Sequence, residues 1–545
     1  MVRIGRGGTL RRREAVLAGV SLLAGGLGAL KPAAAQGSGA PGDQAREISI
    51  GVASAVTSID PHFHNLSSNF NIDINLFDRL IHMDERQQPQ PGLATAWKAL
   101  DDTTWEFTLR QGVVFHDGKP FGAEDVAASI RRVAWVPNSP GSFLVYTRAI
   151  TGIEVVDDHT IRFRTEGPTP LLPVDLSSVM IVPRALEHAP TADFNSGVAA
   201  VGTGPYSFVE YVPNNRVTLR RNDRYWGPKP AWEKATIRMI PVNASRVAAL
   251  LAGDVQAIDS VPPSDAPQLR KNAQLSVVST RSNAVQFLHL DSFRAQTPGV
   301  TARDGSPLPR NPLQDLRVRK AISHAINRDA LVRNIMEGAA APAGQLLADG
   351  FFGVSPRLKP DSYDPAMAKK LLTEAGYADG FAMTLYAPND RYINGAKVAQ
   401  AVGQMLGRVG IETKVETPPW SVFIAQASAP NYNYSAFLIG NSSTTGEASF
   451  PLRSQVGTVD FKTGMGSSNR SRYSNPQVDA VLAEAMRTVD DAKRSALLQK
   501  TAEIAMADQA VVPLLYTDNV YALRKGLHYA PRSDGYLAAA MVQPQ

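Results

Sequence analysis

Three closely spaced segments carry the most information about the fold: PGLATAW (91–97), TWEFTLRQGVVFHDGKPF (104–121) and AEDV (123–126). The alternation of apolar and polar residues in 105–109 is typical of a half-buried strand. The pair Asp117-Gly118 favours a tight hairpin turn, and residues 123–133 are predicted to form a short helix. The large side chains of this stretch are therefore expected to serve packing and hairpin geometry more than ligand contact.

The same mixture of short strands and helices continues through most of the sequence. Glu47–Ala53 alternates at period two and predicts a first strand, and Phe70–Ile81 predicts a helix. Further strands are predicted at Ala284–Leu290 and Val511–Tyr516, with several helices between them. This order of elements indicates an α/β chain with more than one lobe.

Composition excludes several classes of protein. The 545 residues include no cysteine, which rules out disulfides, thiol nucleophiles and thiolate metal sites. Six cations and one anion stand in residues 1–35, so the remaining chain carries only about +1 of the formal net charge of +6. A near-neutral body has no net electrostatic attraction to phosphate backbones, so no nucleic-acid partner is expected.

Residues 1–35 have the three parts of an export signal. A basic start is followed by the uncharged run AVLAGVSLLAGGLGAL (15–30) and by small residues that end at Ala35, where cleavage is expected. Weak hydrophobicity beside consecutive arginines resembles a twin-arginine signal, and an ordinary secretory signal is the alternative. Residues 36–45 are predicted to be a flexible leader. No later segment is long and apolar enough to predict membrane insertion.

Catalytic and cofactor motifs are missing from the sequence. It contains no GxxxxGK[ST], HExxH or GxSxG pattern. Gly202-Thr203-Gly204-Pro205 predicts a tight turn, since the third glycine of a nucleotide loop is absent. His62 and His64 with Asp60 are more typical of a loop than of a metal site. A binding protein without metal or cofactor is therefore favoured over an enzyme.

The opening segments, taken together, resemble the family 5 extracellular solute-binding proteins, the peptide/nickel group that serves ABC importers. Further matching segments follow in the order of the family and extend the resemblance over roughly residues 46–540. They are GTGPY (202–206), NDRYW (222–226), LRVRKAISHAINR (316–328), AKKLLTEAGY (368–377) and VPLLY (512–516).

This resemblance implies a two-lobed, clam-shaped periplasmic-binding-protein fold of type II, in the large peptide-binding subclass. Lobe one is expected to comprise 46–283 and 511–545, with an extra subdomain at about 81–199, and lobe two to comprise 284–510. The two predicted strands at 284 and 511 would be the hinge. The implied function is capture of a peptide-like or other small polar solute in the periplasm by a monomer, and its delivery to an ABC permease.

Loops at strand ends are expected to line the cleft between the lobes. From lobe one the candidates are Ser54, Thr57 and Ser58, for which an ordinary surface turn is the alternative. From lobe two they are Asn389, Asp390 and Arg391, and Trp420. In peptide-binding relatives a basic residue near Arg391 meets the ligand carboxylate, and a guanidinium can do so with two charge-assisted hydrogen bonds. Solvation of Arg391 and core packing of Trp420 are the alternatives.

The remaining candidates lie in the segment GNSSTTGEAS (440–449): Asn441, Ser442, Ser443, Thr444 and Glu447. Dipeptide and oligopeptide binders commonly carry an aspartate here for the ligand ammonium, and Thr444 stands at that position. A hydroxyl cannot neutralise a buried ammonium, whose desolvation would cost several kcal/mol. Either Glu447 or Asp390 takes over this role, or the ligand presents no free amino terminus at this place.

Two other functions stay open at the level of sequence. A sensory or chaperone-like protein would use the same closed lobes to dock on a receptor domain. A secreted hydrolase would need a nucleophile or a metal constellation, and none is found. The ligand is not identified, because one scaffold in this family accepts peptides, metals, opines and glycosides.

Overall fold

The computed structural model describes residues 46–545, so the predicted export signal and leader lie outside the described residues. Its largest sheet has twelve strands. In spatial order the main path is β13 (Val300–Thr301), β15 (Phe381–Tyr386), β17 (Ala436–Ser442), β12 (Leu275–Leu290), β18 (Val512–Arg524), β11 (Ala257–Ile258), β1 (Glu47–Val52), β10 (Lys234–Met239), β9 (Arg216–Arg221) and β8 (Tyr206–Val212). β14 (Ala340–Pro342) pairs with β18, and β16 (Ile411–Glu416) pairs with β15.

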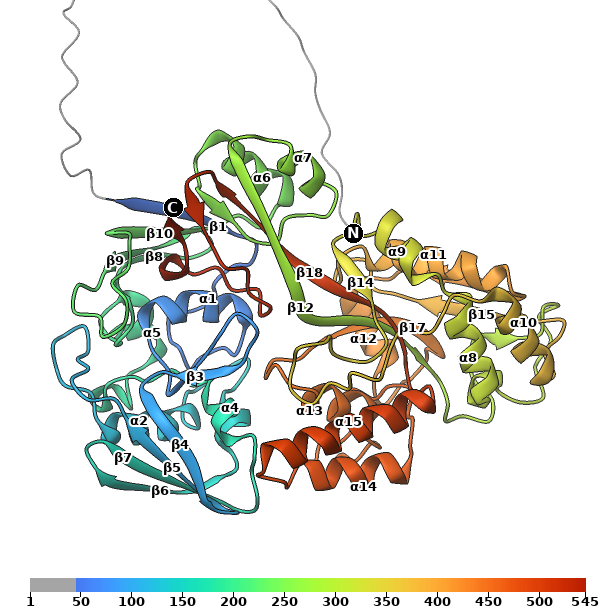
Figure 1. Ribbon diagram of the computed structural model, residues 1–545, viewed down its shortest axis with the longest axis horizontal. Coiled ribbons are helices and arrows are strands. Elements are labelled where there is room, and N and C mark those ends of the chain that lie inside the picture. Colours follow the sequence, from blue (N-terminus) through green and yellow to red (C-terminus); the bar gives the residue numbers. More distant parts are fainter. Residues whose placement is uncertain (1–45) are drawn as a thin grey trace, which may run out of the picture. The chain divides into compact units, whose positions relative to one another are not determined.

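β12 and β18 are the long central strands of this sheet, and they run antiparallel side by side (Figure 1). Both are longer than the sequence pattern predicted, because backbone pairing between them continues through polar residues at 279–281 and 518–519. Their register breaks between Arg281 and Val285. The two halves of β12 therefore pair with different parts of β18 on either side of an irregular link.

A second, four-stranded antiparallel sheet has the order β4 (Ala94–Asp101), β5 (Thr104–Leu109), β7 (Thr160–Thr165) and β6 (Ile150–Asp157). β2 (Ile81–Met83) pairs with β3 (Pro89–Pro91), and β19 (Leu527–His528) pairs with β20 (Gln543–Pro544). The first half of the chain forms helices α1 (Ser67–Leu76), α2 (Ala123–Val133), α3 (Leu144–Thr147), α4 (Leu172–Leu176), α5 (Thr191–Ser196), α6 (Asn243–Ala252) and α7 (Ala266–Arg270).

The second half is richer in helix. It forms α8 (Leu316–Ala325), α9 (Arg328–Asn334), α10 (Pro365–Glu374), α11 (Gly395–Gly407), α12 (Trp420–Ala427), α13 (Ser449–Pro451), α14 (Pro476–Ala485) and α15 (Asp491–Ala507), with a π-helical turn, η3 (Leu452–Val456), directly after α13. Short 3-10 turns are η1 (Arg184–Leu186), η2 (Pro312–Gln314) and η4 (Ala539–Met541). Among residues 46–545, no helix combines the length and hydropathy that a membrane crossing requires.

The buried hydrophobic side chains of the described residues form four clusters. Two draw on 48–275 and 520–542, with Ala339 added, and the other two draw on 285–516. We therefore propose that lobe one comprises 46–283 and 517–545, and lobe two 284–516. The second boundary moves from the expected 511 to about 517, because Val512, Leu514 and Leu515 pack in a core of lobe two.

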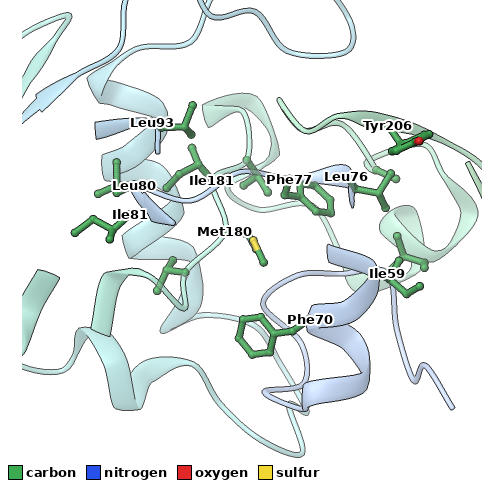
Figure 2. Close-up of a cluster of buried hydrophobic side chains, with 14 of the residues drawn as sticks. Ile59, Phe70, Leu76, Phe77, Leu80, Ile81, Leu93, Met180, Ile181 and Tyr206 are labelled. Atoms are coloured by element: carbon green, nitrogen blue, oxygen red, sulfur yellow. The ribbon is translucent and has the colours of Figure 1, made fainter. Parts of the chain in front are cut away.

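α1 ends at Leu76, earlier than the predicted helix over 70–81, because Phe77 adopts an extended backbone. The turn at 202–204 packs directly against this helix end. Gly204 donates a hydrogen bond from its backbone N–H to the carbonyl of Leu76 (3.1 Å), and a Cβ on Gly202 would lie 2.1 Å from the same oxygen. Both glycines are thus required by close backbone approach. Figure 2 shows Leu76 and Phe77 within the core of lobe one.

The loop after β1 is held by a fully buried ion pair between Asp60 and Arg132. Arg132 donates to both carboxylate oxygens of Asp60 (2.7 and 2.8 Å), and neither side chain has exposed surface. Burial favours a higher pKa for Asp60, but the bonds and charge of Arg132 outweigh it and leave that pKa below its usual value. Burial and the Arg132 charge lower the pKa of His62 to about 4. The pair fastens this loop to α2.

Replacing Arg132 with alanine should destabilise the protein strongly, because Asp60 would be left as a buried charge without a partner. We expect a loss of about 3–5 kcal/mol in the free energy of unfolding. The neighbouring Arg131 forms a more exposed pair with Glu187, and Arg131→Ala should cost less than about 1 kcal/mol. Urea unfolding followed by tryptophan fluorescence and circular dichroism measures both, and equal losses would contradict the assignment.

Candidate functional site

A cavity of about 490 Å³ is lined by residues of both lobes. Its apolar wall includes Val145 and Leu171 from lobe one, and Phe450 and Met486 from lobe two. Small-molecule sites of this size are typically apolar with a few placed polar groups. The cavity therefore has the volume and the mixed lining of a binding site for a small solute.

Three charged side chains line the cavity. Arg148 follows α3 and Asp175 lies on α4, both in lobe one, whereas Arg453 lies on η3 in lobe two. α4 is a short helix with Pro173 in its first turn, and it buries Leu172 and Leu176. Its one carboxylate therefore stands among apolar neighbours at the cavity wall.

The electrostatics of these groups are mutually dependent. Burial raises the pKa of Asp175 to about 8, and the negative charge of Glu447 adds to this effect, while Arg453 and Arg148 oppose it. Burial lowers the pKa of the Arg453 guanidinium, and the positive charge of Arg148 lowers it further. The pKa of Asp175 thus stays high even with the two arginines nearby. A further cation beside it would lower that pKa and favour the carboxylate.

Two hydroxyl groups on the cavity wall have no hydrogen-bond partner among the described residues: those of Thr445 and Ser454. Both oxygens are themselves buried, so they are unsatisfied groups within the cavity wall and are not exposed to its interior. Arg148, Asp175 and Arg453 also line the cavity, so several polar groups in this part of the molecule have no hydrogen-bond partner among the described residues.

A buried relay of side chains reaches the end of β17. The backbone N–H of Ser471 donates to Nδ1 of His289, which assigns the proton to Nε2, and Nε2 donates to Gln455 (3.2 Å). The Gln455 amide in turn donates to Asn441 (3.1 Å). Burial lowers the pKa of His289 to about 3, so the imidazole is neutral. The amide nitrogen of Asn441 has no acceptor among residues 46–545.

The three candidates of lobe one differ in their surroundings. Ser54 is exposed, and Thr57 is exposed with its hydroxyl bonded to His64 (3.0 Å). Ser58 is buried, and its hydroxyl donates to Asn195 (3.0 Å). Ser58 therefore helps to hold the loop in place, and none of the three lines the cavity.

The four candidates of the 389–391 loop and α12 come together. Asp390 accepts a hydrogen bond from the backbone N–H of Trp420 (2.8 Å), and Asn389 donates to the carbonyl of Thr417 (2.8 Å). The Arg391 guanidinium lies 5.4 Å from the Trp420 ring centroid. Asp390 is thus occupied at the helix start, while Arg391 is exposed and forms no ion pair with any described residue. This group lies outside the cavity lining.

The 440–449 loop divides into ligand-facing and structural residues. Thr444 lines the cavity, and Ser442 is exposed. Ser443 is buried and donates its hydroxyl to the carbonyl of Glu447 (2.8 Å). Glu447 accepts two hydrogen bonds from Arg494 (2.9 and 2.8 Å), and both side chains are buried. Ser443 and Glu447 are thus both hydrogen-bonded within lobe two, and neither lines the cavity.

Asn283 links the lobes from the irregular segment of β12. Its amide donates to Gln87 of lobe one and to the carbonyl of Ser443 of lobe two, both at 2.8 Å. Gln87 then donates to the carbonyl of Thr444 (3.3 Å). The candidate loop is therefore held against lobe one beside the cavity.

Arg148, Asp175 and Arg453 were not identified from the sequence. The available signal was weak: Asp175 is the lone charge in the apolar run 171–176. Such a charge predicts either a paired or a functional carboxylate. Its position opposite η3 depends on tertiary packing over nearly 280 residues of chain, which no local pattern reports.

The family model for bacterial extracellular solute-binding proteins, family 5, matches residues 88–462. The glutathione-binding protein GsiB of Salmonella paratyphi A is 28% identical over 495 residues, which cover 89% of this chain and 92% of that protein. The structure of HbpA2 from Haemophilus parasuis has a TM-score of 0.79 at 23% identity and covers 92% of this chain and 100% of that one. DppA from Helicobacter pylori, in complex with the peptide STSA, has a TM-score of 0.70 at 24% identity, with 91% and 98% covered.

Replacing Gly446 with alanine should disturb the link between the lobes. Its φ is +67°, and a Cβ would lie 2.5 Å from the Cβ of Gln87. We expect a loss of about 2–4 kcal/mol in stability from backbone strain and overpacking together. Gly376→Ala is the control, because its φ is +89° and nothing lies within 4 Å. Urea unfolding should show a loss of about 1–2 kcal/mol for the control, and an equal loss for both would contradict the contact with Gln87.

Proposed function

This chain belongs to the bacterial extracellular solute-binding proteins of family 5, and from that premise we propose that it carries a small peptide-like anion. It is the solute-binding component of an ABC importer, which presents its solute to a permease. The feature that supports a peptide-like solute most directly is the cavity lined by both lobes, with apolar walls, two arginines and one ionisable carboxyl group. The relatives named for glutathione and for a bound peptide point to the same class of ligand.

Arg391 and Trp420 are proposed as a second contact region for the ligand. Arg391 is exposed and lies over the Trp420 ring, so its guanidinium is free to bind a carboxylate at the far end of the ligand. Asn389 and Asp390 hold this loop, and Ser54, Thr57, Asn441, Ser442 and Thr444 remain candidate contacts. The ligand would then extend from the cavity toward α12.

Binding is proposed to act through closure of the lobes about β12 and β18. A ligand shifts this equilibrium only if it binds the closed form more tightly, and groups from two lobes provide that difference. We further propose that the protein is exported to the periplasm, acts as a monomer and releases its solute unchanged.

Ligand addition should raise the melting temperature and change the tryptophan fluorescence of the protein. Ligand at 100 times Kd adds about 2.7 kcal/mol to the stability of the folded form. A panel of tripeptides, including γ-glutamyl tripeptides, with sugars, opines and nickel chelates as comparison, tests the proposal. A response confined to sugars or chelates, or no response to any peptide, would contradict a peptide-like solute.

Arg391→Gln should weaken binding of a peptide with a free terminal carboxylate by about 10- to 100-fold, the range of a charge-assisted hydrogen bond. The same variant should bind the corresponding peptide amide as weakly as the wild type does. Arg303→Gln, another exposed arginine of lobe two, should leave both affinities unchanged. Isothermal titration calorimetry measures the six affinities, and an unchanged affinity in Arg391→Gln would remove this residue from the site.

A further inference from the structure

Three charged side chains meet in the cavity without partners from the protein. Within residues 46–545, the side chains of Asp175, Arg148 and Arg453 form no hydrogen bond and no ion pair. Glu447, by contrast, lies close enough to influence Asp175 but is paired with Arg494. The chain therefore neutralises one carboxylate near the cavity and leaves another free at the wall.

The arrangement of signs is specific. Arg148 comes from lobe one and Arg453 from lobe two, and each acts electrostatically on Asp175. The two guanidiniums also repel each other across the cavity. A partly buried cation without a counter-ion is unfavourable, so an anionic group placed between them would bind both and draw the lobes together.

A free α-amino acid carries the complementary pair of charges, an ammonium and a carboxylate on one carbon. An ordinary peptide does not, because its amino-terminal residue has its α-carboxyl group in the peptide bond. A peptide linked through a side-chain carboxyl group retains both charges at its head.

We propose that this cavity holds the free α-amino-acid head of a γ-glutamyl-type peptide, with its ammonium on Asp175 and the adjacent carboxylate between Arg453 and Arg148. This inference rests on the proposed peptide-like solute and names its head group. It also assigns the counter-charge that Thr444 does not supply: the carboxylate comes from lobe one instead of lobe two. The peptide would continue from the head toward Arg391.

Binding of this head should depend on pH. Asp175 faces Glu447, Arg453 and Arg148, and Tyr146 lies on the neighbouring α3. Its pKa of about 8 without ligand means that most molecules carry the protonated acid at neutral pH. An ammonium lowers that pKa, so binding releases a proton, and affinity is lost as pH falls below about 8. Affinity should rise about tenfold between pH 6 and pH 7.

The decisive experiment compares two isomeric tripeptides, γ-Glu-Ala-Gly and α-Glu-Ala-Gly. They have the same atoms and the same formal charges, and differ in whether a carboxylate stands beside the ammonium. Isothermal titration calorimetry with the wild-type protein should give a Kd about 10- to 100-fold lower for the γ-linked peptide, in line with charged hydrogen bonds. Titration in buffers of different ionisation enthalpy should show proton release on binding.

Asp175→Asn and Arg453→Gln should each reduce the preference for the γ-linked isomer to within about threefold, and Asp175→Asn should also remove the pH dependence. The matched control is Asp102→Asn, the same change at an exposed turn of the β4–β5 hairpin, which should keep both properties. Circular dichroism checks that each variant is folded, and Arg453→Gln provides the test if Asp175→Asn is not.

The outcomes separate the two proposals. Equal binding of both isomers by the wild type, or a preserved γ preference in the two folded variants, overturns the head-group assignment while a peptide solute stands. Binding of neither isomer overturns the assignment as well. The wider panel then decides whether the peptide-like solute also fails.

Discussion

Asn283 occupies the point where β12 and β18 lose their register, and its amide binds both lobes at once. On either side of it the strands are buried in separate cores, so each half of a strand must move with its own lobe. Any relative rotation therefore has to be absorbed in the few irregular residues between Arg281 and Val285. Asn283 also holds the 440–449 loop, and this loop carries Thr444, which lines the cavity. The link between the lobes therefore lies beside the cavity.

Pairing distinguishes the buried charges within each lobe from the ionisable groups at the cavity. Asp60 with Arg132 and Glu447 with Arg494 are buried pairs in which each carboxylate has its own guanidinium. Removing a charge from water is costly, and these pairs offset the cost within one lobe. Asp175 and Arg453 differ because the nearest charge complement is not bonded to either of them. Unpaired ionisable side chains therefore mark the cavity wall more clearly than the number of polar residues in a loop does.

Local sequence patterns predicted much of the fold and only part of the site. Alternation and turn pairs identified strands such as β1 and β5, because the period of a strand shows in adjacent residues. The pairing of Glu447 could not be predicted, because its partner Arg494 lies 47 residues away on α15. Asp175 was missed for the same reason, since its role depends on packing against a distant turn. The 389–391 loop and Trp420 could be proposed from the sequence because each follows or begins a recognisable element, and their contact with a ligand stays a prediction.

The route of the chain through β18 sets an order for folding. Asn71 and Asn75 of α1 accept hydrogen bonds from the backbone of Leu537 and Ala539, and the core around α1 includes Tyr521, Tyr529 and Val542. Lobe one is therefore incomplete until these residues have been synthesised, whereas the cores of lobe two need nothing beyond Tyr516. Contacts over more than 450 residues form slowly. During translation, lobe one therefore cannot complete its core until the carboxy-terminal residues are synthesised. Lobe two can complete its cores earlier.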